Sequence, residues 1–283
     1  MDKQANSSGI PRWVQALKPL VTGVYTIDNL DYVSRDSYAC GLSTGSLFVD
    51  RLIHYSFVSR EGLTLHRNGI AALKMFLAIR AYLYSNVYFH RTVRALDIHL
   101  KEVFEPTLKL ILSDNPEKSL SRYLLLTDQS LFAQVRSWNN AAAKRKKLSR
   151  EWQQILSRKK KWVMISGTEI PYLQMPELMT QLTPDQVTAR MQERLPRRIK
   201  FVVDIATQDP RPENLTRMGQ EQFYVYDPDT SSITRSTLED YFREMPSMVV
   251  QCRIYARDRR HSRSLVKAFE QATQRQPSEV TSI

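Results

Sequence analysis

The chain has 283 residues, of which 41 are Lys or Arg and 29 are Asp or Glu, so its net charge is +12. A hydrophobic content of 42% with only 8 glycines excludes a low-complexity chain and is typical of a globular protein with a core. The basic excess favours anionic partners such as nucleotides, nucleic acid or a membrane surface, without choosing among them.

The two cysteines and the apolar runs bear on the cellular compartment. Cys40 and Cys252 have no metal-type spacing, so we expect a reduced, intracellular and cytoplasmic protein. The first residues lack the apolar core of a signal peptide. The longest apolar run, residues 69–84, is interrupted by Lys74 and Arg80, so we expect a soluble chain that spans no membrane.

The N-terminal part reads as a lead-in followed by two helices and a hairpin. We expect residues 1–10 to be disordered and residues 11–22 to form a short amphipathic helix. Residues 25–41 form the next expected helix. A β-hairpin is predicted near 54–67, where two short β-rich runs flank the polar turn Arg-Glu-Gly.

The middle of the chain is predicted to be helical. Apolar stripes at helical spacing begin near Gly69 and, in a second helix, run from about Val87 to Leu112. Further helices are expected over 119–138 and 147–159. Another helix begins after Thr183, because Thr at the N-cap followed by Pro is a start signal.

After Pro196 the pattern changes to short strands, which we expect in the segments KFVVDI, QFYVYD, SSITRS and MVVQCRIYAR. A last helix is expected over about 261–274, and residues 275–283 are expected to be a disordered tail. The predicted fold class is therefore mainly α over 11–195, followed by an α+β subdomain over 196–274.

The segment YTIDNLDYVSRDSYACG, residues 25–41, concentrates acids and aromatics in a basic chain. On a helix, Asp28, Tyr32 and Asp36 fall at i, i+4 and i+8 on one face, and Asp31 can pair with Arg35. Such a face could hold Mg²⁺ or Mn²⁺ through a carboxylate and could lie against a base or sugar through the phenol. The alternative is a solvated surface with local ion pairs.

This segment resembles the D-x-x-D-Y-x-x-R-D-x-x-x-x-G segment of HD-domain phosphohydrolases. It is most similar to the branch of the SAM-and-HD-domain deoxynucleotide triphosphohydrolases and their bacterial relatives. The resemblance implies that Asp28 is a ligand of a divalent metal (Mg, Mn or Fe). It also implies that Tyr32 packs on the substrate nucleotide and that Asp36 binds the sugar hydroxyl.

A second segment, RAYLYSNVYFHRTVRA at residues 80–95, resembles another helix of the same family. The resemblance implies that Arg80 contacts substrate phosphate and Tyr88 lies at the sugar. His90 and Arg91 follow where some relatives contact a regulatory nucleotide. For His90 the alternative is a hydrogen-bonded histidine of a helix.

The chain departs from the family at the metal site. The family also needs an upstream histidine and a His-Asp pair, but this sequence has no His-Asp dipeptide, and its histidines all follow Asp28. We therefore expect an HD-type helical domain truncated at its N-terminus that is inactive alone toward (deoxy)nucleoside triphosphates. The chain could be a fragment, a subunit whose partner chain supplies the other half, a member of a homo-oligomer, or a degenerate nucleotide-binding relative.

Two basic clusters suggest an alternative function. They contain eight cations: Lys144, Arg145, Lys146, Lys147, Arg158, Lys159, Lys160 and Lys161. With Trp152 and Trp162 between or beside them for stacking, they could bind nucleic acid. The other reading is a pair of solvated, charged helices.

Overall fold

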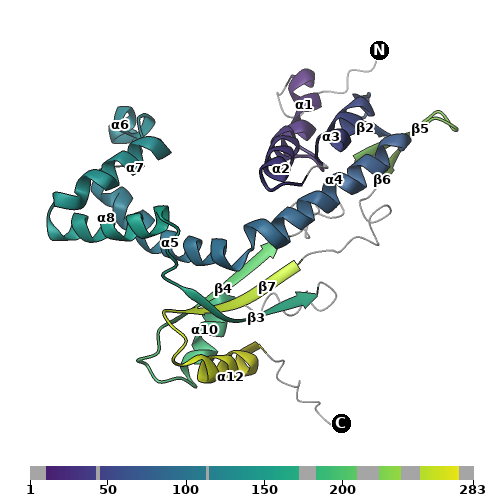
Figure 1. Cartoon of the computed structure of the whole chain (residues 1–283). Helices are drawn as coiled ribbons and strands as arrows, with labels where there is room; N and C mark the ends of the chain where they lie inside the picture. Colours follow the sequence, from purple (N-terminus) through teal and green to yellow (C-terminus); the bar gives the residue numbers. More distant parts are fainter. Residues whose placement is uncertain are drawn as a thin grey trace, which may run out of the picture. The chain divides into compact units, whose positions relative to one another are not determined.

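A computed structural model describes residues 11–42, 45–112, 115–171, 183–208, 223–236 and 249–273. The described residues divide into two compact units. Unit 1 lies within Met1–Tyr88 and Thr207–Val249, and unit 2 lies within Phe89–Ala206 and Val250–Ile283. The predicted fold class, mainly helical with an α+β part, is confirmed (Figure 1). The expected lead-in 1–10 and tail 275–283 lie outside the described residues.

Unit 1 is built on four helices: α1 (Arg12–Thr22), α2 (Ile27–Ala39), α3 (Gly45–His54) and α4 (Ile70–Leu83). The side chain of Thr26 caps α2 by accepting a hydrogen bond from the backbone N–H of Asn29. Helix α4 is the centre of the core, because its Leu73, Phe76 and Leu77 are buried against α2 and α3.

A small sheet completes unit 1, with the strand order β1 (Ser56–Val58), β2 (Leu63–His66), β5 (Phe223–Asp227) and β6 (Ser232–Ser236). Strands β1 and β2 are antiparallel, and Gly62 takes the turn between them at φ +130°, a conformation that favours glycine. Strand β5 pairs in parallel with β2, which places Val225 beside Leu65. The guanidinium of Arg67 strengthens this contact through ion pairs with Asp227 and Asp229.

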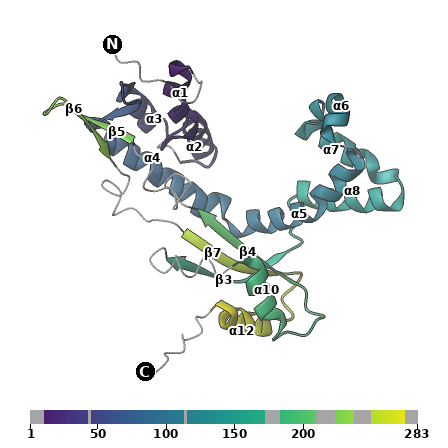
Figure 2. The ribbon, with the colours of Figure 1, turned by 180° about the vertical axis from the view of Figure 1, so that it is seen from behind.

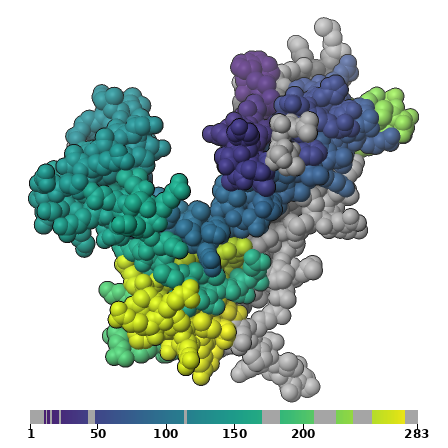
Figure 3. Space-filling view, viewed as in Figure 1, coloured from purple at the N-terminus to yellow at the C-terminus, as the bar shows by residue number. Residues whose placement is uncertain are grey.

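Unit 2 begins with a helical part that contains α5 (Arg91–Ile111), α6 (Leu120–Leu124), α7 (Asp128–Ser137) and α8 (Ala143–Leu156). Figure 3 shows the surface of α6 to α8 in teal. Helices α5 and α8 pack through Trp152, whose indole N–H donates to the Thr107 hydroxyl at 2.8 Å. The expected helix over 119–138 is interrupted between α6 and α7, because Thr127 starts α7 with a capping box formed with Ser130.

The remainder of unit 2 is a three-stranded sheet in the order β3 (Val163–Pro171), β7 (Val249–Ala256) and β4 (Phe201–Gln208), with α10 (Pro184–Gln192) and α12 (Ser262–Thr273). Figure 2 shows these strands and the two helices from behind. Helices α10 and α12 pack on each other, and α12 also contacts β3. Among the described helices, none is both long and apolar enough to cross a membrane.

Candidate functional site

The structure brings four residues that the sequence singles out into one cluster in unit 1. Tyr32 and Asp36 project from α2, Arg80 from the last turn of α4, and Tyr88 from the end of the π-helical turn Tyr84–Tyr88 that follows α4. Helices α2 and α4 pack against each other, which makes these contacts possible. We call these four residues together with Tyr84 the tyrosine–arginine cluster.

Arg80 is the charged centre of the cluster and is only 5% exposed. Its Nε donates a hydrogen bond to the Tyr32 hydroxyl at 3.1 Å, and its guanidinium carbon lies 5.8 Å from the centre of the Tyr84 ring. Its Nη1 atom is buried and has no hydrogen-bond partner among the described residues. Since a buried donor without a partner costs free energy, this nitrogen is an unfilled position for an acceptor.

The π-helical turn sets the positions of two tyrosines. Such turns are wider than α-helical ones, are rare, and occur often at functional sites. Here the turn places the Tyr84 hydroxyl 3.3 Å from the Tyr32 hydroxyl, and the Tyr88 hydroxyl donates a short hydrogen bond to the Asp36 carboxylate. The rings of Tyr84 and Tyr88 meet edge to face at 4.9 Å. The turn therefore aims both phenols at α2.

The phenols of Tyr32 and Tyr88 stay protonated at neutral pH. Burial raises the pKa of Tyr88, and its hydrogen bond to the Asp36 carboxylate raises it further. Burial and the hydrogen bond with Tyr84 raise the pKa of Tyr32, against the opposing effect of Arg80. Protonated phenols can donate as well as accept, so the cluster offers a cation, several hydroxyl groups, a carboxylate and ring faces within one small volume.

Asp28 lies in the first turn of α2 and is exposed. A divalent cation needs several oxygen or nitrogen ligands. Among the described residues, Asp28 belongs to no group of three His, Cys, Asp or Glu side chains whose ligand atoms lie close together. Asp28 alone therefore does not fit a resident metal.

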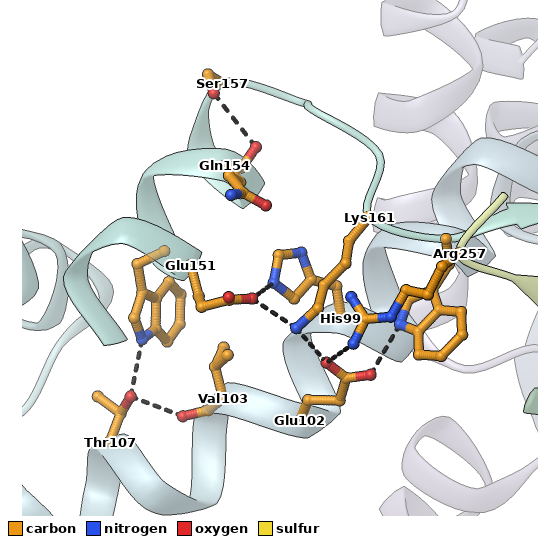
Figure 4. Close-up of polar contacts among 11 residues, drawn as sticks. His99, Glu102, Val103, Thr107, Glu151, Gln154, Ser157, Lys161 and Arg257 are labelled. Atoms are coloured by element: carbon orange, nitrogen blue, oxygen red, sulfur yellow. Dashed lines mark hydrogen bonds and ion pairs between the residues drawn. The ribbon is translucent and has the colours of Figure 1, made fainter. Parts of the chain in front are cut away.

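One group of metal-ligand type does occur among the described residues, in unit 2. His99 and Glu102 on α5 and Glu151 on α8 have ligand atoms within 4.8 Å of one another, a set that could hold a metal ion. Figure 4 shows the Lys161 amine lying between the two carboxylates, 2.6 Å from Glu102 and 2.5 Å from Glu151. The ammonium group of Lys161 therefore already takes the place of a cation.

His99 is neutral in this network. Its Nε2 lies 2.6 Å from Glu151, and its Nδ1 is buried without a hydrogen-bond partner among the described residues. A second proton on Nδ1 would therefore have no acceptor. Burial lowers the pKa of His99 and outweighs the opposing effect of Glu151.

Two other predicted site residues start α5 in unit 2. His90 is the N-cap, and its Nδ1 accepts a hydrogen bond from the backbone N–H of Thr92 at 3.3 Å. Arg91 is exposed, and its carbonyl accepts a hydrogen bond from the Tyr255 hydroxyl. The contact of His90 is the one expected for a histidine of a helix terminus, and its role toward a regulatory nucleotide stays a prediction.

Most cations of the basic clusters are exposed, and one, Lys161, is half-buried. Seven of the eight cations are exposed: Lys144, Arg145, Lys146, Lys147, Arg158, Lys159 and Lys160. Lys161 is held in the network with Glu102 and Glu151. The expectation that Trp152 and Trp162 stack on bases is wrong, because both indoles are buried in the core of unit 2.

Sequence reasoning missed several members of these sites. Tyr84 lies four residues after Arg80 and four before Tyr88, and this spacing could have identified it. His99 and Glu102, three residues apart on one helix face, could likewise have signalled a polar cluster. The contribution of Glu151 depends on the packing of α8 on α5, which no local pattern specifies.

The comparisons with known proteins give distant relatives, and no family model matches the chain. A segment of 126 residues, 41% of this chain and 28% of the relative, is 26% identical to the uncharacterized protein MJ1154 of Methanocaldococcus jannaschii. A segment of 91 residues, 32% of this chain and 21% of the relative, is 24% identical to the uncharacterized protein YwfO of Bacillus subtilis.

Solved structures share the fold over most of the chain. A hypothetical protein from Aquifex aeolicus matches with a TM-score of 0.61 and 25% identity, over 90% of this chain and 59% of that protein. A phosphohydrolase from Bacteroides thetaiotaomicron matches with a TM-score of 0.54 and 18% identity, over 86% of this chain and 64% of that protein. The chain thus spans less than two thirds of the length of each of these four proteins.

Proposed function

We propose that the chain supplies the nucleotide-binding part of an HD-type, metal-dependent phosphohydrolase that acts on (deoxy)nucleoside triphosphates. The observation that carries the proposal is the buried Nη1 of Arg80, which lacks a partner among the described residues. The likeness of the fold to a phosphohydrolase from Bacteroides thetaiotaomicron supports the reaction class.

Arg80 is suited to a phosphate group. A guanidinium is permanently charged and offers donors in a planar fork that matches phosphate oxygens. In the unliganded chain, Nε is used by Tyr32 whereas Nη1 is not used by any described residue. Because Arg80 is nearly buried, a phosphate reaches Nη1 only when a neighbouring side chain moves. Tyr84, which lies over the guanidinium on the π-helical turn, is the side chain that we expect to rotate.

The remaining groups of the cluster suit the sugar and the base. The Asp36 carboxylate, which accepts from Tyr88, can also accept a hydrogen bond from a sugar hydroxyl. The Tyr32 ring, which is 6.4 Å from the Tyr88 ring, can lie against a flat nucleoside. A phosphate, a sugar and a base thus each find a suitable group within one cluster.

Hydrolysis of a nucleotide would require metal ligands in addition to the residues of the tyrosine–arginine cluster. A metal held in the complete enzyme would supply the activation of an attacking water, and Asp28 would be one of its ligands. The histidine ligands that the family also needs would be supplied by a partner chain. We therefore propose that this chain alone binds nucleotide without hydrolysing it.

The proposal is tested by titrating dNTPs into the chain in a buffer with EDTA, using isothermal calorimetry. Arg80→Met should weaken binding at least about tenfold, because a hydrogen bond to a charged group is worth about 1.5–3 kcal/mol. Arg35→Met is the matched control, since Arg35 is exposed and pairs only with Asp31 among the described residues. Equal affinity of Arg80→Met and the wild type would refute the assignment.

Thermal unfolding without ligand separates binding from folding. Arg80→Met removes a buried, incompletely paired cation, so we expect the unliganded variant to be at least as stable as the control variant. A variant that unfolds at much lower temperature would show instead that Arg80 serves mainly to hold α2 on α4.

A further inference from the structure

A second site lies in unit 2, apart from the residues of the proposed function. It is a cavity of about 650 Å³ between α7, α8 and the turn after α8. Three of its lining side chains are cations: Arg136 on α7, Arg150 on α8, and Lys159 in the turn. Among the described residues, its lining includes no acidic and no aromatic side chain.

The positive charge of the cavity is not compensated. Among the described residues, no carboxylate lies within ion-pair distance of Arg136, Arg150 or Lys159, although many other cations of the chain do form such pairs. The acid next to Arg150 is Glu151, and it faces the other way, toward His99 and Lys161. Three cations that converge on one cavity without acids create a potential that attracts anions.

Hydrogen bonds at the end of α8 pair carbonyl oxygens whose partial negative charge would otherwise repel an anion. Arg158 adopts φ 56°, and the backbone N–H groups of Arg158 and Lys159 donate to the carbonyls of Ile155 and Gln154. The Ser157 hydroxyl donates to the Gln153 carbonyl at 2.6 Å. The carbonyls of Gln153, Gln154 and Ile155 are thus paired inside the protein.

The polar side chains of the cavity wall are partly used within the protein. The Gln153 amide donates to Asn139 at 2.7 Å, and the proton of Ser157 is already donated to a carbonyl. Recognition would therefore depend on the three charges more than on directed hydrogen bonds. Leu156 is the one apolar side chain among the described lining residues. None of these residues has an aromatic ring on which a base could stack.

We propose that this cavity binds a compact polyphosphate, a ligand with several linked phosphates whose charge the three cations neutralise. Inorganic tripolyphosphate and the triphosphate tail of a nucleotide share this chemistry. Because none of the described lining residues is aromatic, we expect affinity to depend on the number of phosphates and not on the base. The three cations, from α7, α8 and the turn after α8, surround one small open pocket, which suits a compact anion better than an extended nucleic acid strand.

The test measures tripolyphosphate binding by isothermal calorimetry in the Arg80→Met background, which removes the proposed nucleotide site. The paired substitution Arg136→Gln and Arg150→Gln takes away two of the three cavity charges. The matched control, Lys144→Gln and Lys146→Gln, removes the same charge from α8 outside the cavity. The four side chains substituted on α7 and α8 are exposed, and circular dichroism verifies that each variant is folded.

We expect the cavity variant to lose at least about tenfold in affinity and the control to lose much less. dATP and dGTP should bind as tightly as tripolyphosphate, and all three should weaken as salt is raised. Equal losses in both variants, or no binding at low salt, would overturn the proposal. Tighter binding of a long single-stranded oligonucleotide, lost in the control variant as well, would also overturn it in favour of a nucleic acid surface along α8.

Discussion

At the scale of single residues, Arg80 lowers the stability of the fold but provides a donor for an anionic ligand. Its guanidinium is nearly buried, yet Nη1 has no partner among the described residues. A buried polar group without a partner costs roughly 1–3 kcal/mol, so the unliganded cluster is stabilised when an anion arrives. The Lys161 ammonium differs, because two carboxylates already surround it. We therefore expect the Arg80 guanidinium, but not the Lys161 ammonium, to accept an anionic ligand.

His99 predicts how stability depends on pH. Its pKa is lowered by burial from the ordinary value of 6.5, so the unfolded chain binds more protons than the folded chain below that pH. This contribution to stability is complete above pH 6.5 and is lost as the pH falls below it. Urea unfolding at about pH 7.5 and about pH 5.5 should show a smaller free energy of unfolding at the lower pH.

The substitution His99→Gln tests whether His99 causes this loss of stability at lower pH. Gln keeps an N–H that can donate to Glu151 but cannot take up a proton in this range. Glu151 itself contributes at lower pH, because its hydrogen bonds with Lys161 and His99 outweigh burial and lower its pKa below the ordinary 4.5. If His99→Gln keeps the full difference between the two pH values, another group causes it.

Part of the candidate site follows from residue spacing. Asp28, Tyr32 and Asp36 share one helix face by their spacing, and the structure brings Tyr32 and Asp36 together with Arg80 and Tyr88. The hydrogen bond from Arg80 to Tyr32 could not be predicted, since it needs α2 to pack on α4. The ion pairs of Lys161 with Glu102 and Glu151 could not be predicted either, because Lys159 and Lys160 lie in the same run of basic residues.

At the scale of elements, the turns that follow two helices set the positions of side chains at both candidate sites. The π-helical turn after α4 aims Tyr84 and Tyr88 at α2, and the turn after α8 shapes the wall of the basic cavity. Helix starts with Thr caps, as at α10, follow from sequence. Strand β3 was missed, because it follows directly on a basic helix and carries Gly167 within a run of mixed polarity.

Arg158 gives a prediction at this scale. It takes φ 56° at the end of α8, a left-handed conformation that costs a residue with a side chain roughly 1–2 kcal/mol. Arg158→Gly should therefore raise the free energy of unfolding by about 1 kcal/mol, measured by urea unfolding. Arg158→Ala is the control, because it removes the charge but keeps the Cβ atom. A glycine variant no more stable than the alanine variant would contradict this account.

At the scale of the whole molecule, the two candidate sites belong to different units. The tyrosine–arginine cluster lies in unit 1 and the basic cavity in unit 2. The helical and α+β composition could be predicted from periodicity. The parallel pairing of β2 with β5 could not, because it joins residues about 160 positions apart and depends on packing rather than on local pattern.

The central claim is that this chain binds nucleoside triphosphates at Arg80 without hydrolysing them. Equilibrium dialysis with labelled dNTP and Mn²⁺, followed by chromatography of the retained nucleotide, tests binding and turnover in one sample. We predict that the wild-type chain retains intact dNTP above the level that the basic cavity holds in Arg80→Met. Nucleotide cleaved faster than in buffer, or equal retention by the wild type and Arg80→Met, would contradict the claim.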